Sequence, residues 1–332
     1  MVDQQNAKSL DDPAGLSVLI VGCGSIGKRH ARVLTQLGVR DLRVCDPVAA
    51  QCETLRAEVG AAKVYDSLQA GLRDQPACVF ICTPPWLHVP QAMQAIRAGA
   101  HVFSEKPLSD SLAGVDALIA LAENARRQVM VGLCFRYHDG LAKAKQFVAQ
   151  DRIGRVVAVR ALVGEHLPDV RPDYRTLFSA QKTGAFDLMH DIDLALWFAD
   201  QSVTQVHSVF GSFSDIGIAA PDIVEILIAF ADRCVATVHL DFFQRPRRRQ
   251  IEIIGTRGVV LVEFARWEQC TVSLFEAARG EWVHETLATA RDDMFRAEDR
   301  EFLRAVASGA PVTSTVAEAR KSLEVVLAAQ NL

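Results

Sequence analysis

A glycine pattern near the start of the chain limits its fold more than any other feature. Positions 22–27 read G-C-G-S-I-G, which has the spacing G-x-G-x-x-G. The pattern follows the apolar run Leu16–Gly22 and opens the amphipathic stretch Ser25–Gly38. It therefore stands between a predicted strand and a predicted helix, the context in which this spacing is typical of a dinucleotide-binding fold.

Each position of the pattern has a physical task. Gly22 permits the tight turn, Gly24 lets the backbone approach a pyrophosphate, and Gly27 allows close packing of helix and strand. The helix start at Ser25 and Ile26 offers N–H groups and a partial positive charge to phosphates. We therefore expect these five residues to bind the cofactor.

Asp46 ends the second predicted strand, about 20 residues after the last glycine. A carboxylate there accepts hydrogen bonds from the ribose 2′- and 3′-hydroxyls and repels a 2′-phosphate. The next residue is Pro47 and not an arginine. The sequence therefore predicts NAD as cofactor and disfavours NADP.

The first 135 residues alternate apolar runs with amphipathic stretches. Such alternation implies a parallel sheet covered by helices on both faces. The strand-like runs are Leu16–Gly22, Asp41–Asp46, Ala77–Thr83, His101–Pro107 and the run that begins at Val129. The helical stretches are Ser25–Gly38, the stretch that Gly60 ends, His88–Gly99 and Ser111–Gln128.

The pattern changes after about residue 150. Six β-rich runs between Val203 and Glu285, without helices between them, predict a large, mostly antiparallel sheet. The other expected elements are a strand at Val156–Val163, a polar loop at Glu165–Gly184, and helices at Asp187–Ala199, Asp292–Ser308 and Val316–Gln330. We expect an α/β dinucleotide-binding domain over residues 1–135 and an α+β substrate domain over 136–332. Packing of the last helices back onto the first domain is left open.

Two segments stand at the carboxyl ends of predicted strands, where ligands bind in open α/β sheets. One is T-P-P at positions 83–85, followed by His88, and the other is E-K-P at positions 105–107. A third polar group, in the second half, is predicted on the helix that begins at Asp187. It consists of Asp187, His190 and Asp193.

In their order and spacing these motifs resemble the Gfo/Idh/MocA oxidoreductases, which are sugar and cyclitol dehydrogenases. The resemblance covers nearly the whole chain. It implies that Lys106 holds the substrate hydroxyl near the nicotinamide, that His190 is the general acid/base, and that Asp187 orients His190 or binds a neighbouring hydroxyl. A cis bond before Pro107 is typical of the family.

The resemblance also implies further contacts. Those expected near the cofactor are Thr83, Pro84, His88 and Glu105. Arg136 and Tyr174 are expected at the substrate, with a structural interdomain contact left open for Arg136. In one respect the chain departs from the family, because its aspartate precedes the histidine by three residues where many members have four. This spacing is typical of a sub-branch and leaves the substrate open.

Some polar segments allow more than one interpretation. The loop around Tyr174 is either a specificity loop or a solvated connection. The basic run R-P-R-R-R at positions 245–249 is expected at an exposed hairpin end or edge, with an anionic ligand such as a nucleotide sugar as the alternative.

Composition excludes several classes of protein. The 332 residues carry a net charge of −4, which gives no general electrostatic attraction to nucleic acid or to an anionic membrane surface. The polar first fifteen residues are unlike a secretory signal, and no apolar run is long enough to span a membrane. The eight cysteines contain no C-x-x-C pair and are expected to be buried thiols, with a metal site or redox switch as the alternative. No metal is expected.

We therefore expect a cytoplasmic NAD(H)-dependent oxidoreductase that moves hydride between nicotinamide C4 and a secondary alcohol of a sugar or cyclitol. By resemblance, the open face of the second sheet would form homodimers or homotetramers. Two alternatives stay open. One is a lyase or glycosidase that oxidises and re-reduces its substrate on retained NAD, and the other is a dinucleotide-binding sensor without catalysis.

Overall fold

The computed structural model describes residues 15–180 and 183–331. The expectation about the polar first fifteen residues falls almost wholly outside this part of the chain. The described residues divide into two compact units. The first contains the chain up to Cys134 and Asp292–Leu323, and the second contains Phe135–Arg291 and the residues from Glu324 on.

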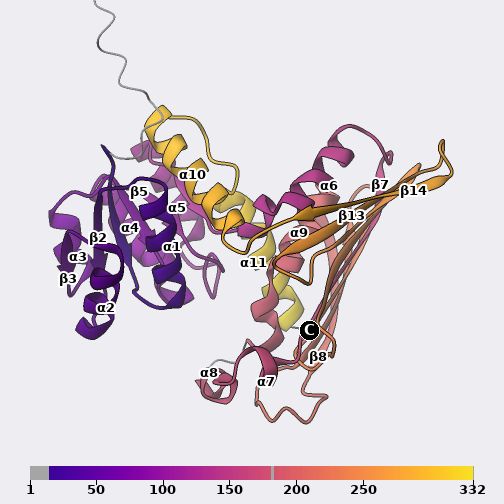
Figure 1. Ribbon diagram of the computed structural model, residues 1–332, viewed down its shortest axis with the longest axis horizontal. Helices are drawn as coiled ribbons and strands as arrows, with labels where there is room; N and C mark the ends of the chain where they lie inside the picture. Colours follow the sequence, from indigo (N-terminus) through magenta and orange to yellow (C-terminus); the bar gives the residue numbers. More distant parts are fainter. Residues whose placement is uncertain (1–14, 181–182, 332) are drawn as a thin grey trace, which may run out of the picture. The chain divides into compact units, whose positions relative to one another are not determined.

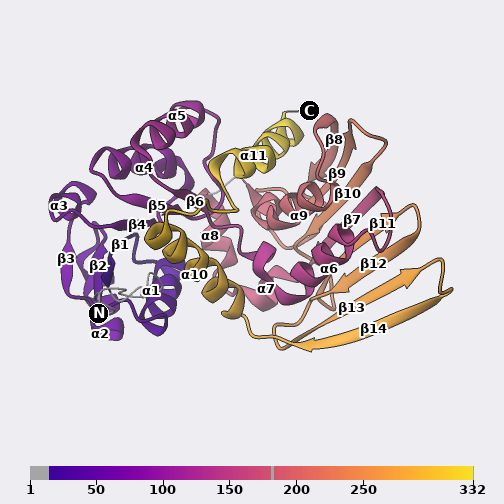
Figure 2. The same cartoon turned by 90° about the horizontal axis from the view of Figure 1, so that it is seen from above.

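The first unit is built on six parallel strands, drawn in indigo to purple in Figure 1, in the order β3-β2-β1-β4-β5-β6, all of which are labelled in Figure 2. The first strand, β1, lies in the middle of the sheet, and later strands are added on both sides of it. This order confirms the doubly wound sheet that the alternation predicts. The strands are β1 (Ser17–Val21), β2 (Asp41–Cys45), β3 (Lys63–Tyr65), β4 (Cys78–Ile81), β5 (His101–Ser104) and β6 (Val129–Val131).

Helices flank this sheet. α1 starts directly after Gly24, and α2 ends at Gly60, whose φ of 68° suits glycine. α5 is shorter than the predicted stretch, and the small elements β3 and α3 were not predicted. The helices are α1 (Ser25–Gln36), α2 (Ala49–Val59), α3 (Leu68–Arg73), α4 (His88–Arg97), α5 (Val115–Ala125) and α10 (Asp293–Ser308).

Helix α10 belongs to this unit although it comes late in the chain, and it lies beside α1 (Figure 2). Its Phe302 packs edge-on against Phe80 of β4, with the ring centroids 5.4 Å apart. Phe80 in turn stacks on Phe103 of β5 at 4.7 Å. All three rings are fully buried, so α10 completes the hydrophobic core on one side of the sheet.

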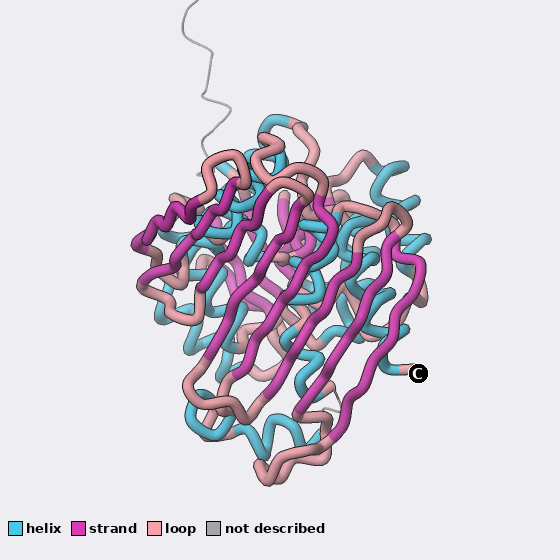
Figure 3. The backbone as a smooth tube through the Cα atoms, turned by 90° about the vertical axis from the view of Figure 1, so that its right-hand side faces the viewer, coloured by secondary structure: helices cyan, strands magenta, loops and turns pink. Residues whose placement is uncertain are grey.

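The second unit is built on eight strands in the order β14-β13-β12-β11-β7-β10-β9-β8 (Figure 3). Only the β7–β10 pair is parallel, which confirms a large, mostly antiparallel sheet. β14 was not predicted, because seven of its eight residues are exposed and leave no alternating pattern. The strands are β7 (Val156–Gly164), β8 (Val203–Gly211), β9 (Ile223–Phe230), β10 (Val235–Asp241), β11 (Arg248–Gly255), β12 (Gly258–Glu263), β13 (Gln269–Glu276) and β14 (Glu281–Ala288).

Helices α6 (Asp139–Ala149) and α9 (His190–Ala199) pack against this sheet (Figure 2). The segment expected to be a polar loop contains two short helices, α7 (Leu167–Val170) and α8 (Tyr174–Ala180), so that prediction was wrong in part. The last helix, α11 (Val316–Gln330), agrees with its predicted bounds.

All eight cysteines are buried free thiols. Burial raises the pKa of the Cys45 thiol to about 12 and that of Cys78 to about 12. Such thiols stay protonated and behave as small apolar side chains, which confirms the expectation of buried cysteines.

Candidate functional site

The glycine loop between β1 and α1 has no room for side chains at two of its positions. Gly22 has a φ of +96°, and a Cβ there would lie 2.6 Å from the carbonyl oxygen of Cys82. A Cβ on Gly27 would lie 1.9 Å from the carbonyl oxygen of Gly22. At Gly24 a Cβ would meet nothing within 4 Å. The loop is thus tight where strand and helix pack, and open at the start of α1, where a phosphate would approach the N–H groups of Ser25 and the residues after it.

Asp46 lies at the end of β2, next to this loop. Its Oδ2 accepts a hydrogen bond from the Cys23 N–H and its Oδ1 accepts one from the Val48 N–H, both at 2.8 Å. The carboxylate is half-buried, and a carboxylate has about four lone-pair sites, so room for ribose hydroxyls is left. The residues present therefore fit a dinucleotide.

Three segments leave the sheet at one edge, because β1, β4 and β5 are direct neighbours. The glycine loop follows β1, Thr83-Pro84 follows β4, and Glu105-Lys106 follows β5. Backbone bonds continue the ladder beyond the strands: the Cys82 N–H donates to Val21 O at 2.7 Å, and the Glu105 N–H donates to Ile81 O at 2.9 Å. The first unit thus brings the expected cofactor residues and Lys106 to one place.

His88, which was expected near the cofactor, connects two of these segments. Its side chain is almost completely buried, with Nδ1 2.8 Å from the carbonyl oxygen of Pro107 and Nε2 2.6 Å from that of Thr83. The Thr83 hydroxyl donates to Gln91 Oε1 at 2.7 Å. His88 therefore braces the backbone on both sides of the edge, while its contact with a cofactor stays a prediction.

Glu105 points into the protein and Lys106 is half-buried. One carboxylate oxygen of Glu105 lies 2.9 Å from His30 Nε2, and the other accepts the Lys106 N–H at 2.9 Å. The Lys106–Pro107 peptide bond is cis, as in the family that the motif resembles. The carboxylate thus holds the backbone from which the Lys106 side chain starts.

In the second unit, Asp187 and His190 do not share one α-helix, and that prediction was wrong. Asp187 lies in a 3₁₀ segment, Gly184–Leu188, and His190 is the first residue of α9. Gly184 has a φ of +53°, and a Cβ there would lie 2.1 Å from the Pro221 carbonyl oxygen, so this position has a left-handed backbone and no room for a side chain. The Thr183 hydroxyl donates to Asp187 Oδ1 at 3.0 Å. The His190 ring is half-buried, with its centroid 4.9 Å from that of Phe135.

Two buried ion pairs fix the first turn of α9. Asp191 pairs with Arg249 through Oδ2 at 2.5 Å, and Asp193 pairs with Arg136 through both oxygens. Neither aspartate side chain is more than 3% exposed. These pairs hold the helix start, and with it His190, in one orientation.

Arg136 and Tyr174, both expected at the substrate, are engaged inside the second unit. Arg136 forms the ion pair with Asp193, and the Tyr174 hydroxyl donates to the Ile216 carbonyl oxygen at 2.9 Å. Tyr174 is only 8% exposed. Both side chains therefore have structural roles that the sequence patterns did not show.

The arginines of the basic run are not all exposed, contrary to expectation. Arg249 is buried, and Arg247 is half-buried with Nε 3.0 Å from Glu165. The exposed Arg245 donates twice to Asp169, at 2.8 and 2.9 Å. Carboxylates thus neutralise Arg245, Arg247 and Arg249 within the unit.

Sequence reasoning missed the buried polar residues that lie behind the Glu105–Lys106 segment. His30, on the apolar face of α1, is fully buried between Glu105 and Asp299. Its spacing with buried apolar residues of α1 was the one available signal. Asp299 and Glu298, on α10, could not be connected with it, because only folding brings segments so far apart in sequence together.

Two profiles of one family match the chain. "Oxidoreductase family, NAD-binding Rossmann fold" matches residues 16–133, and the "GFO/IDH/MocA C-terminal domain" matches residues 141–261. Together they span both units and most of the chain. The chain belongs to the Gfo/Idh/MocA family.

Several members of the family are similar along the chain. The inositol 2-dehydrogenase of Salmonella paratyphi B is 31% identical over 58% of this chain and 56% of its own length, little more than half of each. The myo-inositol dehydrogenase Hyg17 of Streptomyces leeuwenhoekii is 28% identical over 95% of this chain and 96% of its own. Among solved structures, GenD2 from gentamicin A biosynthesis, in complex with NAD, is 26% identical with a TM-score of 0.79, covering 95% and 93%.

Neither a bilayer-spanning helix nor a metal-binding group of side chains occurs among the described residues. No helix in 15–180 or 183–331 is both long and apolar enough to cross a bilayer. Over the same residues, no group of three or more histidine, cysteine, aspartate or glutamate side chains is arranged to hold a metal ion.

Proposed function

We propose that this protein is an NAD-dependent dehydrogenase that acts on a secondary alcohol of a cyclitol or related sugar. One observation carries the proposal: the glycine loop, Thr83-Pro84 and Lys106 follow three neighbouring strands and stand at one edge of the first sheet. An ammonium group beside a dinucleotide site is suited to holding an alcohol for oxidation. The naming of the relatives as inositol dehydrogenases supports the same reading.

The first domain, up to residue 135, would hold the cofactor. Gly22, Gly24 and Gly27 shape the loop, the N–H groups of Ser25 and Ile26 face the pyrophosphate, and Asp46 accepts from the ribose hydroxyls. Thr83, Pro84, His88 and Glu105 form the adjoining edge. Bound NAD⁺ supplies a hydride acceptor at nicotinamide C4. The negative charge of Asp46 disfavours NADP.

The chain's own residues would handle the hydroxyl and its proton. The Lys106 ammonium hydrogen-bonds the substrate oxygen and stabilises the negative charge that develops there. His190 takes the hydroxyl proton, or returns it in the reverse direction. Asp187 orients His190 or binds a neighbouring hydroxyl. Lys106 belongs to the first unit and His190 to the second, so the proposal requires both to reach one hydroxyl in the working enzyme.

The paired arginines favour an uncharged substrate over a nucleotide-linked sugar. A phosphate-binding site needs cationic groups that are free to bind, whereas three of the four arginines of the basic run, Arg245, Arg247 and Arg249, are each paired with a carboxylate. The fourth, Arg248, is exposed and donates to the Gln250 side chain. An uncharged ring with several hydroxyls, such as an inositol, is compatible with arginines that are already paired with carboxylates. The C-terminal domain, residues 136–332, would bind it.

The test is to mix the protein with NAD⁺ and a panel of compounds, and to follow the absorbance of reduced nicotinamide. The panel contains myo-inositol, scyllo-inositol, neutral hexoses and a nucleotide-linked sugar. Net NADH from a neutral ring supports the proposal. Sugar turnover without net NADH favours the lyase or glycosidase alternative, and NAD binding without any turnover favours the sensor.

We also propose a cytoplasmic enzyme that associates through the second sheet. One face of β8, β9 and β10 exposes apolar side chains, with Val209 64%, Leu227 45% and Val235 46% exposed. A second copy of the chain would cover them in a homodimer or homotetramer. Sedimentation of the purified protein tests this; a monomer at micromolar concentration contradicts it.

A further inference from the structure

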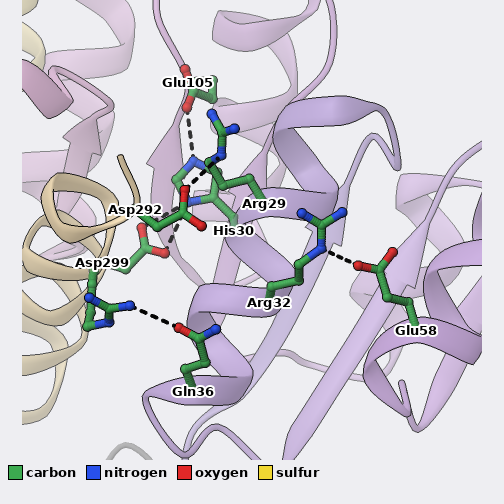
Figure 4. A network of polar contacts seen from close by, with 9 residues as sticks. Arg29, His30, Arg32, Gln36, Glu58, Glu105, Asp292 and Asp299 are labelled. Atoms are coloured by element: carbon green, nitrogen blue, oxygen red, sulfur yellow. Dashed lines mark hydrogen bonds and ion pairs between the residues drawn. The ribbon is translucent and has the colours of Figure 1, made fainter. Parts of the chain in front are cut away.

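A chain of buried polar contacts runs from Asp299 on α10 through His30 to Glu105 (Figure 4). It continues from Glu105 to the backbone of Lys106. His30 on α1 stands in its middle, with no exposed side-chain surface. Its Nδ1 lies 2.9 Å and 3.1 Å from the two carboxylate oxygens of Asp299. Its Nε2 lies 2.9 Å from Glu105 Oε1.

The contacts suit a charged imidazole, although burial also raises the pKa of the Asp299 carboxyl. Both ring nitrogens face carboxylates, and only the imidazolium can donate a hydrogen bond from both. Burial opposes the charge on His30, but Asp299 and Glu105 outweigh it and hold its pKa well above the ordinary value. Burial likewise opposes the charge on Glu105, and His30 outweighs it there, so the pKa of Glu105 lies below its usual range.

The second carboxylate oxygen of Glu105 contacts the backbone of Lys106. It accepts the N–H of Lys106 at 2.9 Å. Gly132 lies next to this carboxylate and leaves room for it, because a Cβ built at position 132 would lie only 3.3 Å from Glu105 Cδ. The start of the Lys106 side chain is therefore fixed through Glu105, and the place of Glu105 is fixed by His30.

Other groups surround the imidazole on every side. The rings of Phe80, Phe103 and Phe295 lie 5.6, 5.0 and 5.7 Å away, which excludes water. The titratable neighbours near the cluster are Glu298 on α10 and Cys82 after β4. Burial raises the pKa of both well above ordinary values, so both are neutral. The charges that act on Glu105 are therefore those of His30 and Lys106.

We propose that His30 is a positioning residue that holds Lys106 at the substrate hydroxyl by anchoring Glu105. The inference rests on the proposed role of Lys106 in alcohol oxidation. A buried ion pair adds little to stability compared with apolar packing, so its presence next to the backbone of Lys106 is better explained by placement of that residue. Small displacements of a reacting group cost rate steeply, which makes such an anchor useful.

The test uses the full-length protein and two substitutions of graded severity. His30→Gln keeps an amide donor for Glu105 but removes the charge, and His30→Leu removes both. We expect kcat to fall about 10-fold in His30→Gln and about 100-fold or more in His30→Leu, with the Kd for NAD⁺ unchanged in each. This graded loss in kcat alone is not expected from a general loss of packing.

The matched control is an ion pair that joins the same two helices, α1 and α10, without contacting Glu105. Arg29 Nε lies 3.2 Å from Asp292 Oδ1, at the start of α10. Asp292→Asn should leave kcat unchanged. If a His30 variant does not fold, Asp299→Asn replaces it: it keeps a hydrogen bond to His30 but weakens its charge, and should lower kcat by a smaller factor.

A second readout does not depend on activity. In ¹⁵N NMR spectra of histidine-labelled protein at pH 8, both His30 nitrogens should carry protons, and the signals should vanish in His30→Gln. A neutral His30 overturns the inference, and so does full kcat in well-folded His30→Gln. Absence of any dehydrogenase activity in the wild type overturns the proposed function instead, whatever the charge of His30.

Discussion

The guanidinium of Arg136 donates to both carboxylate oxygens of Asp193, at 2.9 and 2.7 Å. The two side chains are 8% and 3% exposed, so the pair is almost wholly removed from water. It connects the 3₁₀ segment Cys134–Tyr137 with the first turn of α9, which begins at His190. A residue that sequence alone suggests for substrate binding is thus part of the support for the proposed base.

Arg136→Met should therefore destabilise the second unit strongly. It leaves Asp193 as a buried, unpaired charge, which typically costs about 3–5 kcal/mol in free energy of unfolding. Denaturant unfolding followed by circular dichroism measures this loss. The double variant Arg136→Met/Asp193→Leu should recover most of it, because both charges are then gone. A single variant as stable as the wild type would show that the pair is not isolated from water.

Lys106→Ala should lower turnover at least about a hundredfold while NAD⁺ binding stays nearly intact. The ammonium is proposed to stabilise charge that exists only during the reaction, so its loss affects kcat more than cofactor affinity. Steady-state kinetics and calorimetric titration with NAD⁺ separate the two. Lys63→Ala, a lysine of β3 that pairs with Asp74, is the matched control and should keep full turnover. Normal turnover in Lys106→Ala would remove this residue from the mechanism.

His190→Ala should also lower turnover at least about a hundredfold with NAD⁺ affinity preserved. If the side chain transfers a proton, added imidazole should restore part of the rate. His284, an exposed histidine of β14 outside the proposed association face of β8–β10, gives the control, and His284→Ala should leave the rate unchanged. An unaffected His190→Ala enzyme would require another group to accept the proton.

The fold could be predicted from sequence where patterns are local. Buried parallel strands are continuous apolar runs, and glycines mark the ends of helices at Gly60 and near Gly38. The bounds of β1, β2, β4 and α1 therefore agree with prediction to within a residue or two. β14 was not predicted, because most of its residues are exposed and give no apolar alternation. Asp187 was placed in a helix because its spacing to His190 fits one, whereas Asp187 lies in the 3₁₀ segment Gly184–Leu188 and α9 begins only at His190.

Long-range pairing limited the prediction of the site. The glycine loop and E-K-P segment are each recognisable from neighbours in sequence. The partners of Arg136, Arg249 and His30 lie 57, 58 and 269 residues away, and no local pattern reveals them. Sequence reasoning therefore found the residues proposed to do chemistry, and missed those that hold them in place.

Asp46→Ala should weaken NAD⁺ binding and narrow the preference for NAD⁺ over NADP⁺. A hydrogen bond to a charged group is worth about 1.5–3 kcal/mol, which corresponds to about a 10- to 150-fold loss of affinity. Affinity for NADP⁺ should fall less or rise, because the repulsion of the 2′-phosphate is gone. Fluorescence titration with both cofactors measures this. Glu53→Ala, on the exposed face of α2, is the control, and unchanged NAD⁺ affinity in Asp46→Ala would contradict the ribose assignment.

Glu298→Gln should make the protein's stability less dependent on pH. Glu298 is fully buried, neither of its oxygens has a hydrogen-bond partner among the described residues, and burial raises its pKa well above the ordinary 4.5. Above pH 4.5 the unfolded chain loses this proton while the folded protein keeps it. The free energy of unfolding therefore falls as the pH rises, by up to about 1.4 kcal/mol per pH unit.

The pKa of His30 is also raised, so above pH 6.5, its ordinary pKa, the unfolded chain loses this proton while the folded protein keeps it. Part of the fall in the free energy of unfolding with rising pH should therefore persist in Glu298→Gln. Urea unfolding between about pH 5 and pH 8 gives the slope for each protein. Wild type should lose stability over this range more steeply than Glu298→Gln, which should be the more stable of the two at pH 8. Asp293→Asn, at the exposed start of α10, should keep the wild-type slope. Equal slopes in wild type and Glu298→Gln would mean that the buried carboxyl is ionised in the folded protein, and that water or a cation compensates its charge.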